Sequence, residues 1–157
     1  MDAQEFLVLK TDLDEQLALI DVVYERLEDR AQDFNAGCII QMESVAYQIH
    51  SSYNAIKGLL RLVAAHFEYQ VGDAARWHSA LLPRMAQPVP GVRPAPLTKE
   101  TYLLVDGLRG FRYLFLHGYA VSVEPALLQF NLERARRTQK LLHTDISDFI
   151  EQLRPAQ

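Results

Sequence analysis

The sequence predicts an all-α protein, built as an antiparallel bundle of about five helices. Apolar residues recur every three or four positions along most of the chain, which is the spacing of one helical face. No segment alternates apolar and polar residues as a half-buried strand would. Short turn segments separate the periodic stretches, so successive helices should return antiparallel. We expect residues 1–157 to form one domain, because a chain of this length can bury a single core.

Two long helices are predicted in the first half of the chain. The first carries an apolar stripe made of Phe6, Leu9, Leu13, Leu17, Ile20, Val23, Leu27, Ala31 and Phe34. Residues 35–37 then supply a turn that ends in glycine. The second helix repeats the spacing with Val45, Ile49, Tyr53, Ile56, Leu59, Leu60, Val63 and Phe67. Gly72 and Asp73 should end it.

A shorter helix, a loop and two more helices are predicted in the second half. Residues 74–85 can form the short helix, and the prolines that follow prevent regular helix over residues 86–97. Thr98 is a suitable N-cap for a fourth helix through the apolar segment 98–120. Residues 122–125 interrupt the pattern before a last long helix, whose apolar stripe holds Leu128, Ala135, Leu142, Ile146, Phe149, Ile150 and Leu153.

Composition excludes several classes of protein. A net charge of −4 argues against coating nucleic acid through bulk positive charge, so any RNA site must be local. The single Cys38 cannot form an internal disulfide, and no apolar run is long enough for a membrane span or a secretory signal. We therefore expect a cytoplasmic protein that contacts no membrane. None of the five histidines has metal-ligand spacing, so we expect no metal and no cofactor.

Three polar residues stand out in the apolar segment 98–120: Arg112, His117 and Tyr119. Desolvating a cation costs several kcal/mol unless an anion or hydrogen bonds offset the cost. On a straight helix Arg112 and Tyr119 nearly align, whereas His117 lies about 140° from Arg112. Gly118 can end or distort the helix, and a two-fold dimer can bring Arg112 and His117 of facing chains around one cleft; our hypothesis is that both act together. Because this helix is apolar nearly all round, we expect a homodimer.

The spacing of Arg112, His117 and Tyr119 resembles the signature of the HEPN superfamily, in the HepT-like ribonuclease toxins of prokaryotic toxin-antitoxin pairs. Further residues that follow the family's order extend the resemblance over roughly residues 45–130. They are Ile49, His50, Tyr53, Ile56, Trp77, His78, Leu81, Leu82, Met85, Leu108, Arg109 and Phe111.

The resemblance implies a HEPN-like bundle acting as a metal-independent endoribonuclease, with RNA bound in a cleft between the two subunits. His117 would take the proton from the ribose 2′-hydroxyl, so DNA would be spared. Arg112 would hold and stabilise the phosphate through its planar guanidinium. Tyr119 has two candidate roles. Its hydroxyl could orient His117 or the scissile phosphate, and, as the resemblance implies, it would accept AMP from a partner nucleotidyltransferase antitoxin, which would silence the nuclease.

Other residues leave alternatives open. Arg134, Arg136, Arg137 and Lys140 on the last helix, with Arg109 on the fourth, are either RNA contacts or a solvated basic face. Tyr113 and Leu116 occupy positions where active relatives carry polar or basic residues. The alternative function is therefore a catalytically inactive helical module that binds a nucleotidyltransferase or a nucleotide. We interpret His50 and His78 as structural, and His66 and His143 as surface residues.

Overall fold

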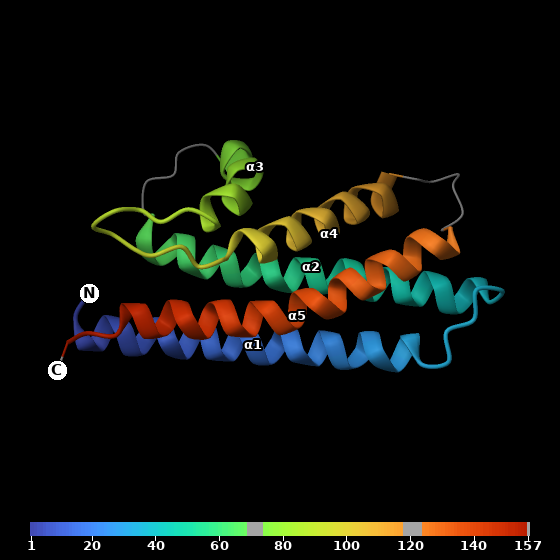
Figure 1. Ribbon diagram of the computed structural model, residues 1–157, viewed down its shortest axis with the longest axis horizontal. Helices are drawn as coiled ribbons and strands as arrows, with labels where there is room; N and C mark the ends of the chain where they lie inside the picture. Colours follow the sequence, from blue (N-terminus) through green and yellow to red (C-terminus); the bar gives the residue numbers. More distant parts are fainter. Residues whose placement is uncertain (69–73, 118–123, 157) are drawn as a thin grey trace.

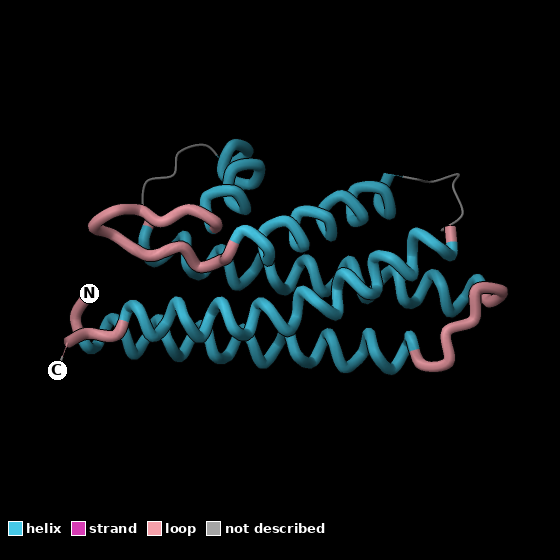
Figure 2. Tube along the Cα trace, in the orientation of Figure 1, coloured by secondary structure: helices cyan, strands magenta, loops and turns pink. Residues whose placement is uncertain are grey.

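The computed structural model describes residues 1–68, 74–117 and 124–156; for residues 74–79 and 114–117 it describes the backbone alone. Within these ranges the chain forms five helices: α1 (Ala3–Ala31), α2 (Ile39–Phe67), α3 (Ala74–Met85), α4 (Lys99–His117) and α5 (Pro125–Leu153). Figure 2 shows helices joined by loops, with no strand in the part of the chain that the structure describes. The predicted all-α bundle is confirmed.

The helix ends follow from local chemistry. At the start of α1 the Asp2 side chain accepts a hydrogen bond from the Glu5 backbone N–H at 2.8 Å, and the Glu5 carboxylate accepts from the Asp2 N–H at 3.0 Å. This capping box satisfies two N–H groups that would otherwise lack partners. Between α1 and α2, the Gln41 side chain donates to the Gln32 carbonyl at 2.9 Å and accepts from the Asn35 N–H at 2.7 Å. These bonds fix the turn that reverses the chain.

The three 29-residue helices α1, α2 and α5 lie side by side and supply most of the core, with α4 packed across α2 and α5 (Figure 1). Each contributes most of the stripe that its sequence predicts, and the fully buried members include Leu13, Ile20, Leu27, Ile49, Ile56, Val63, Ala135, Leu142 and Ile146. Burying one such aliphatic side chain larger than alanine contributes about 1.5–3 kcal/mol. In α1, Tyr24 is buried while the predicted Val23 is only partly buried, and the predicted Phe34 lies beyond the end of the helix. Both chain termini emerge at the same end of the bundle (Figure 1).

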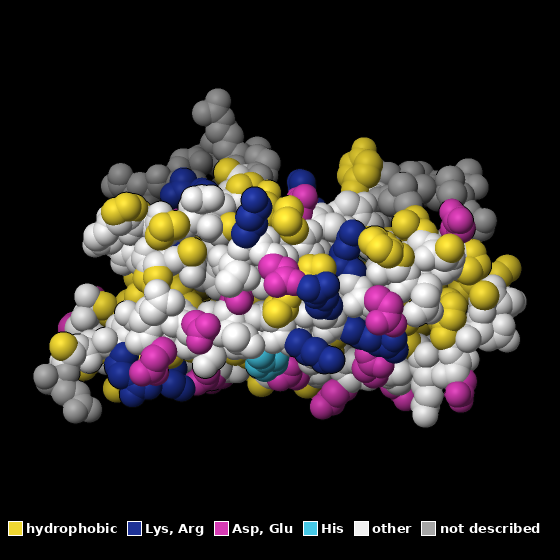
Figure 3. Space-filling view, viewed as in Figure 1, with side chains coloured by type: hydrophobic (Ala, Val, Ile, Leu, Met, Phe, Trp, Pro, Cys, Tyr) yellow, Lys and Arg dark blue, Asp and Glu magenta, His cyan; other side chains and the backbone are white. Residues whose placement is uncertain are grey.

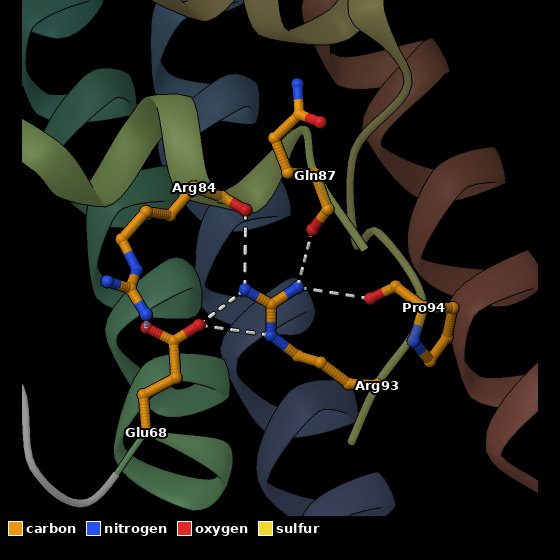
Figure 4. A network of polar contacts seen from close by, with 5 residues as sticks. All are labelled: Glu68, Arg84, Gln87, Arg93 and Pro94. Carbon is orange, nitrogen blue, oxygen red and sulfur yellow. Dashed lines mark hydrogen bonds and ion pairs between the residues drawn. The ribbon is translucent and has the colours of Figure 1, made fainter. Parts of the chain in front are cut away.

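The proline-rich loop over residues 86–97 is anchored by Arg93, whose side chain is fully buried (Figure 4). Its guanidinium donates to a carboxylate oxygen of Glu68, just after α2, and to the carbonyls of Gln87 at 2.9 Å and Pro94 at 3.1 Å. Arg84 on α3 pairs with the other Glu68 oxygen at 2.8 Å. The loop is therefore fastened to the ends of α2 and α3, although prolines exclude regular helix there.

Thr98 caps α4 as its sequence predicts, and it also ties α4 to α5. The Thr98 hydroxyl accepts from the Thr101 N–H at 3.4 Å and donates to the buried Asp145 carboxylate at 3.0 Å. Asp145 also accepts from the Thr98 N–H at 2.8 Å. Helix α4 ends at His117, so the part of the expected segment at 118–120 lies outside the described residues. Among the described helices, none combines the length and the apolar character needed to cross a membrane.

Candidate functional site

Arg112 lies half-buried on α4 and reaches across to α2. Its guanidinium carbon is 5.7 Å from the centroid of the Tyr53 ring, a distance at which the ring face attracts a cation. The Arg112 Nε is buried and has no hydrogen-bond partner among the described residues. No carboxylate of the described chain forms an ion pair with Arg112. The cation is thus held in place by an aromatic ring while its charge has no described counterion.

The other two residues of the expected site are described less fully. His117 is the last residue of α4, and its backbone alone is described. Tyr119 lies outside the described residues. The convergence of Arg112 with His117 therefore stays a prediction.

A basic face surrounds Arg112. It consists of His50, Lys57 and Arg61 on α2 together with Arg109 and Arg112 on α4. The three α2 residues lie within about 40° of one another around their helix, at about 100° per residue. No Asp or Glu occurs between Glu43 and Glu68 or between Asp106 and Glu124. A chain with a net charge of −4 therefore concentrates positive charge where α2 packs against α4.

The cations of this face act on one another and on the His50 ring. Burial, and then repulsion by Arg61 and Arg112, lowers the pKa of Lys57. Burial, and then repulsion by Arg112, lowers the pKa of His50 below its usual range. The Asn54 side-chain amide donates to the His50 Nε2 at 3.2 Å, which also favours the neutral ring. His50, interpreted from the sequence as structural, thus lies within the field of the candidate catalytic arginine.

Tyr53 links this face to the hydrophobic interior. Burial raises the pKa of its hydroxyl, and the cations around it oppose that rise. With Lys57 it lines a small pocket that α3 and α4 close with Leu81, Leu82 and Val105. Lys57 and Arg61 are not among the site residues predicted from the sequence. The signal that could have found them is a pair of cations four residues apart in an acid-free stretch of α2.

Two of the four basic candidates on α5 are paired with glutamates. Arg136 donates to both Glu28 oxygens at 2.7 and 3.0 Å and to Glu133, and the Glu28 bond contributes most to raising its pKa. Arg137 pairs with Glu100. Figure 3 accordingly shows Lys and Arg side chains interspersed with Asp and Glu over the middle of the molecule. The positive charges of Arg136 and Arg137 are therefore offset.

Three further candidates differ in their surroundings. Arg134 stacks over the Phe130 ring, with 4.6 Å from the guanidinium carbon to the ring centroid. Arg109 pairs with Asp106 at 2.8 Å, and Lys140 is exposed. His143, expected at the surface, is partly exposed and bonds Asp21 of α1 at 2.7 Å. Across the described residues, no three His, Cys, Asp or Glu side chains are grouped so as to hold a metal ion.

Comparison with known proteins assigns the family. A family model described as HepT-like protein matches residues 44–153, from the first third of α2 to the end of α5. Searches of curated proteins and of solved structures gave no match. The matched range covers more than half of the chain and includes Arg112, His117 and Tyr119. The chain therefore belongs to the HepT-like family of the HEPN superfamily.

Proposed function

We propose that this protein is a metal-independent endoribonuclease of a toxin-antitoxin pair, with Arg112 and His117 as its catalytic residues. Membership of the HepT-like family supports a HEPN-type function related to such pairs. One structural observation carries the proposal: Arg112 is half-buried against Tyr53 and close enough to act on Lys57, with no described carboxylate to match its charge. An RNA phosphate would supply the missing anion.

The proposed reaction follows from the chemistry of the two side chains. The His117 imidazole takes the proton from a ribose 2′-hydroxyl, since its ordinary pKa lies near neutrality. The 2′-oxygen then bonds to phosphorus, the bond from phosphorus to the 5′-oxygen breaks, and the imidazolium returns the proton to that 5′-oxygen. Arg112 stays charged throughout and stabilises the negative phosphorane through its planar fork of donors. DNA is spared because it lacks the 2′-hydroxyl.

The proposed cleft lies between two copies of the chain. Arg112 and His117 are five residues apart and lie about 140° from each other on a regular helix, so one straight helix does not focus both on one phosphate. Helix α4 also exposes the apolar side chain of Leu103, which is 55% accessible. A two-fold dimer that covers this side chain would bring Arg112 of one copy towards His117 of the other.

The proposed partner is a nucleotidyltransferase antitoxin that transfers AMP to Tyr119. The adenylate would carry a negative phosphodiester next to the basic face and would compete with RNA for the same cations. Arg109 and the α5 residues Arg134, Arg136, Arg137 and Lys140 are proposed as secondary RNA contacts. Lys140 is the strongest of these, because it is exposed and forms no ion pair with a described residue.

The test is cleavage of total cellular RNA by the purified protein in excess EDTA. We expect the wild-type protein to degrade RNA and His117→Ala to lower the rate by about 100-fold or more, the usual loss for a general base. Lys10→Gln, on the far helix α1, is the control and should cleave like the wild type. Equal RNA loss with wild type and His117→Ala would contradict the proposal. Absence of cleavage with retained binding to a nucleotidyltransferase would favour the inactive binding module instead.

A further inference from the structure

We propose that Lys57 and Arg61 form a binding site for single-stranded RNA, contacting phosphates that flank the one held by Arg112. The inference deepens the proposed function, since it takes RNA as the ligand.

The geometry places these cations in a row. Lys57 and Arg61 are one helical turn apart on α2, which separates their Cα atoms by about 6 Å along the helix axis. Lys57 also lies one turn after Tyr53, the residue whose ring holds the Arg112 guanidinium at 5.7 Å. Arg61 is exposed and Lys57 is partly exposed beside a pocket lined by Val105 of α4. The row therefore runs from Arg112 along α2 towards its C-terminus.

The like charges of this row repel one another in the folded protein. Lys57 forms no ion pair with any described residue, and repulsion by Arg61 and Arg112 adds to the burial that lowers its pKa. Arg136 and Arg137 of α5 differ from Lys57, because glutamates offset their charge. A folded core does not need adjacent like charges on one face, whereas a polyanion bound along that face would relieve their repulsion.

Aromatic residues near the Arg112 end of the row favour a single strand over a duplex. Tyr47 is 56% exposed, and its ring centroid lies 6.3 Å from that of His50. Tyr113, which follows Arg112, is 66% exposed. Exposed aromatic rings next to cations are how proteins stack unpaired bases while contacting the backbone. Bases of a duplex are already stacked on one another and would gain nothing from these rings.

The experiment measures binding without cleavage. A fluorescent single-stranded 2′-O-methyl RNA lacks the nucleophilic hydroxyl, so fluorescence anisotropy over a series of KCl concentrations reports affinity alone. We expect Lys57→Gln and Arg61→Gln each to weaken binding several-fold and to reduce the slope of log K against log salt by about 0.7, the value for one phosphate contact on a single strand. Lys57→Arg should restore most of the slope. With unmodified RNA, both Gln variants should raise KM and leave kcat unchanged.

Controls separate this inference from the proposed nuclease. Lys10→Gln removes a cation of α1 that is paired with Asp14, and it should leave the slope unchanged. The inference would be overturned if the Lys57→Gln, Arg61→Gln double variant kept the wild-type slope of log K against log salt. It would also be overturned if Lys10→Gln lowered that slope as much as the double variant does. Both results count even where the wild type cleaves RNA. If the double variant has a smaller salt slope but the wild type never cleaves unmodified RNA, the binding site is supported and only the nuclease proposal is overturned. If the double variant has a lower melting temperature than the wild type, the salt slope of the single variant Arg61→Gln is the test instead. Arg61 is exposed, so replacing it should not disturb the core.

Discussion

Three arginines of this chain lie in three different environments, and the difference decides what each can do. Arg93 is fully buried and donates its hydrogen bonds to Glu68 and to backbone carbonyls. Arg136 is held by two glutamates at the surface. Arg112 instead faces an aromatic ring and lies among other cations. Of the three, Arg112 is therefore the one whose charge is available to a ligand.

The electrostatic effect of Arg112 on its neighbours can be tested by measuring the pKa of His50. Removing the guanidinium in Arg112→Gln should raise the pKa of His50 towards its ordinary value of about 6.5, although burial, the larger cause, will keep it below that value. The measurement is an NMR titration of the imidazole protons. Arg109→Gln is the matched control, because Arg109 pairs with Asp106 and is not among the causes of the His50 shift. An identical shift in both variants would show that Arg112 does not act on His50.

The same titration has a consequence for stability. The lowered pKa means that the unfolded chain binds a proton at His50 more readily than the folded chain does. The contribution of His50 to stability is therefore fully present above pH of about 6.5 and is lost as the pH falls through the lowered value. In Arg112→Gln this loss should be smaller.

At the scale of elements, the helices could be predicted from sequence, but the contacts between them could not. The apolar period predicts α1, α2 and α5, and the turn residues predict α3 over residues 74–85. The pairing of Arg93 with Glu68 joins residues 25 positions apart and depends on where α3 returns to α2. The contact of Arg112 with Tyr53 likewise depends on the register of α4 against α2. No local pattern in the sequence predicts either of these two contacts.

The anchor of the proline-rich loop predicts a specific loss of stability. Arg93→Gln should cost about 3 kcal/mol, because it leaves the buried Glu68 carboxylate with Arg84 alone and leaves carbonyls of the loop without a donor. Urea unfolding followed by circular dichroism measures the change. Arg154→Gln, which breaks an exposed pair with Glu151, should change stability by less than about 1 kcal/mol. Equal losses in the two variants would mean that the buried network contributes no more than a surface pair.

At the scale of the whole molecule, α1 is part of the core although it precedes the residues that match the family model. Its inner face buries Leu13, Ile20, Tyr24 and Leu27, and its most extensive packing is against α2. The basic face on α2 is thus supported from behind by α1. Overall composition cannot reveal such a face, since an excess of acidic residues elsewhere in the chain hides it.

Two neighbouring residues of α1 test this role. Ile20 is fully buried and Leu19 is 59% exposed. Ile20→Ala should lower the free energy of unfolding by about 2–5 kcal/mol, whereas Leu19→Ala should change it by less than about 0.5 kcal/mol. Guanidinium unfolding of both variants provides the comparison. Similar values would mean that α1 does not pack on α2 as described.

The position of the two termini has a practical consequence. Both emerge at one end of the bundle, while α4 runs towards the other end before it stops at His117 (Figure 1). A fusion partner, or an anchor to a sensor surface, can therefore be attached through the first or the last residues without covering that far end. Either attachment leaves room there for a second protein molecule to dock.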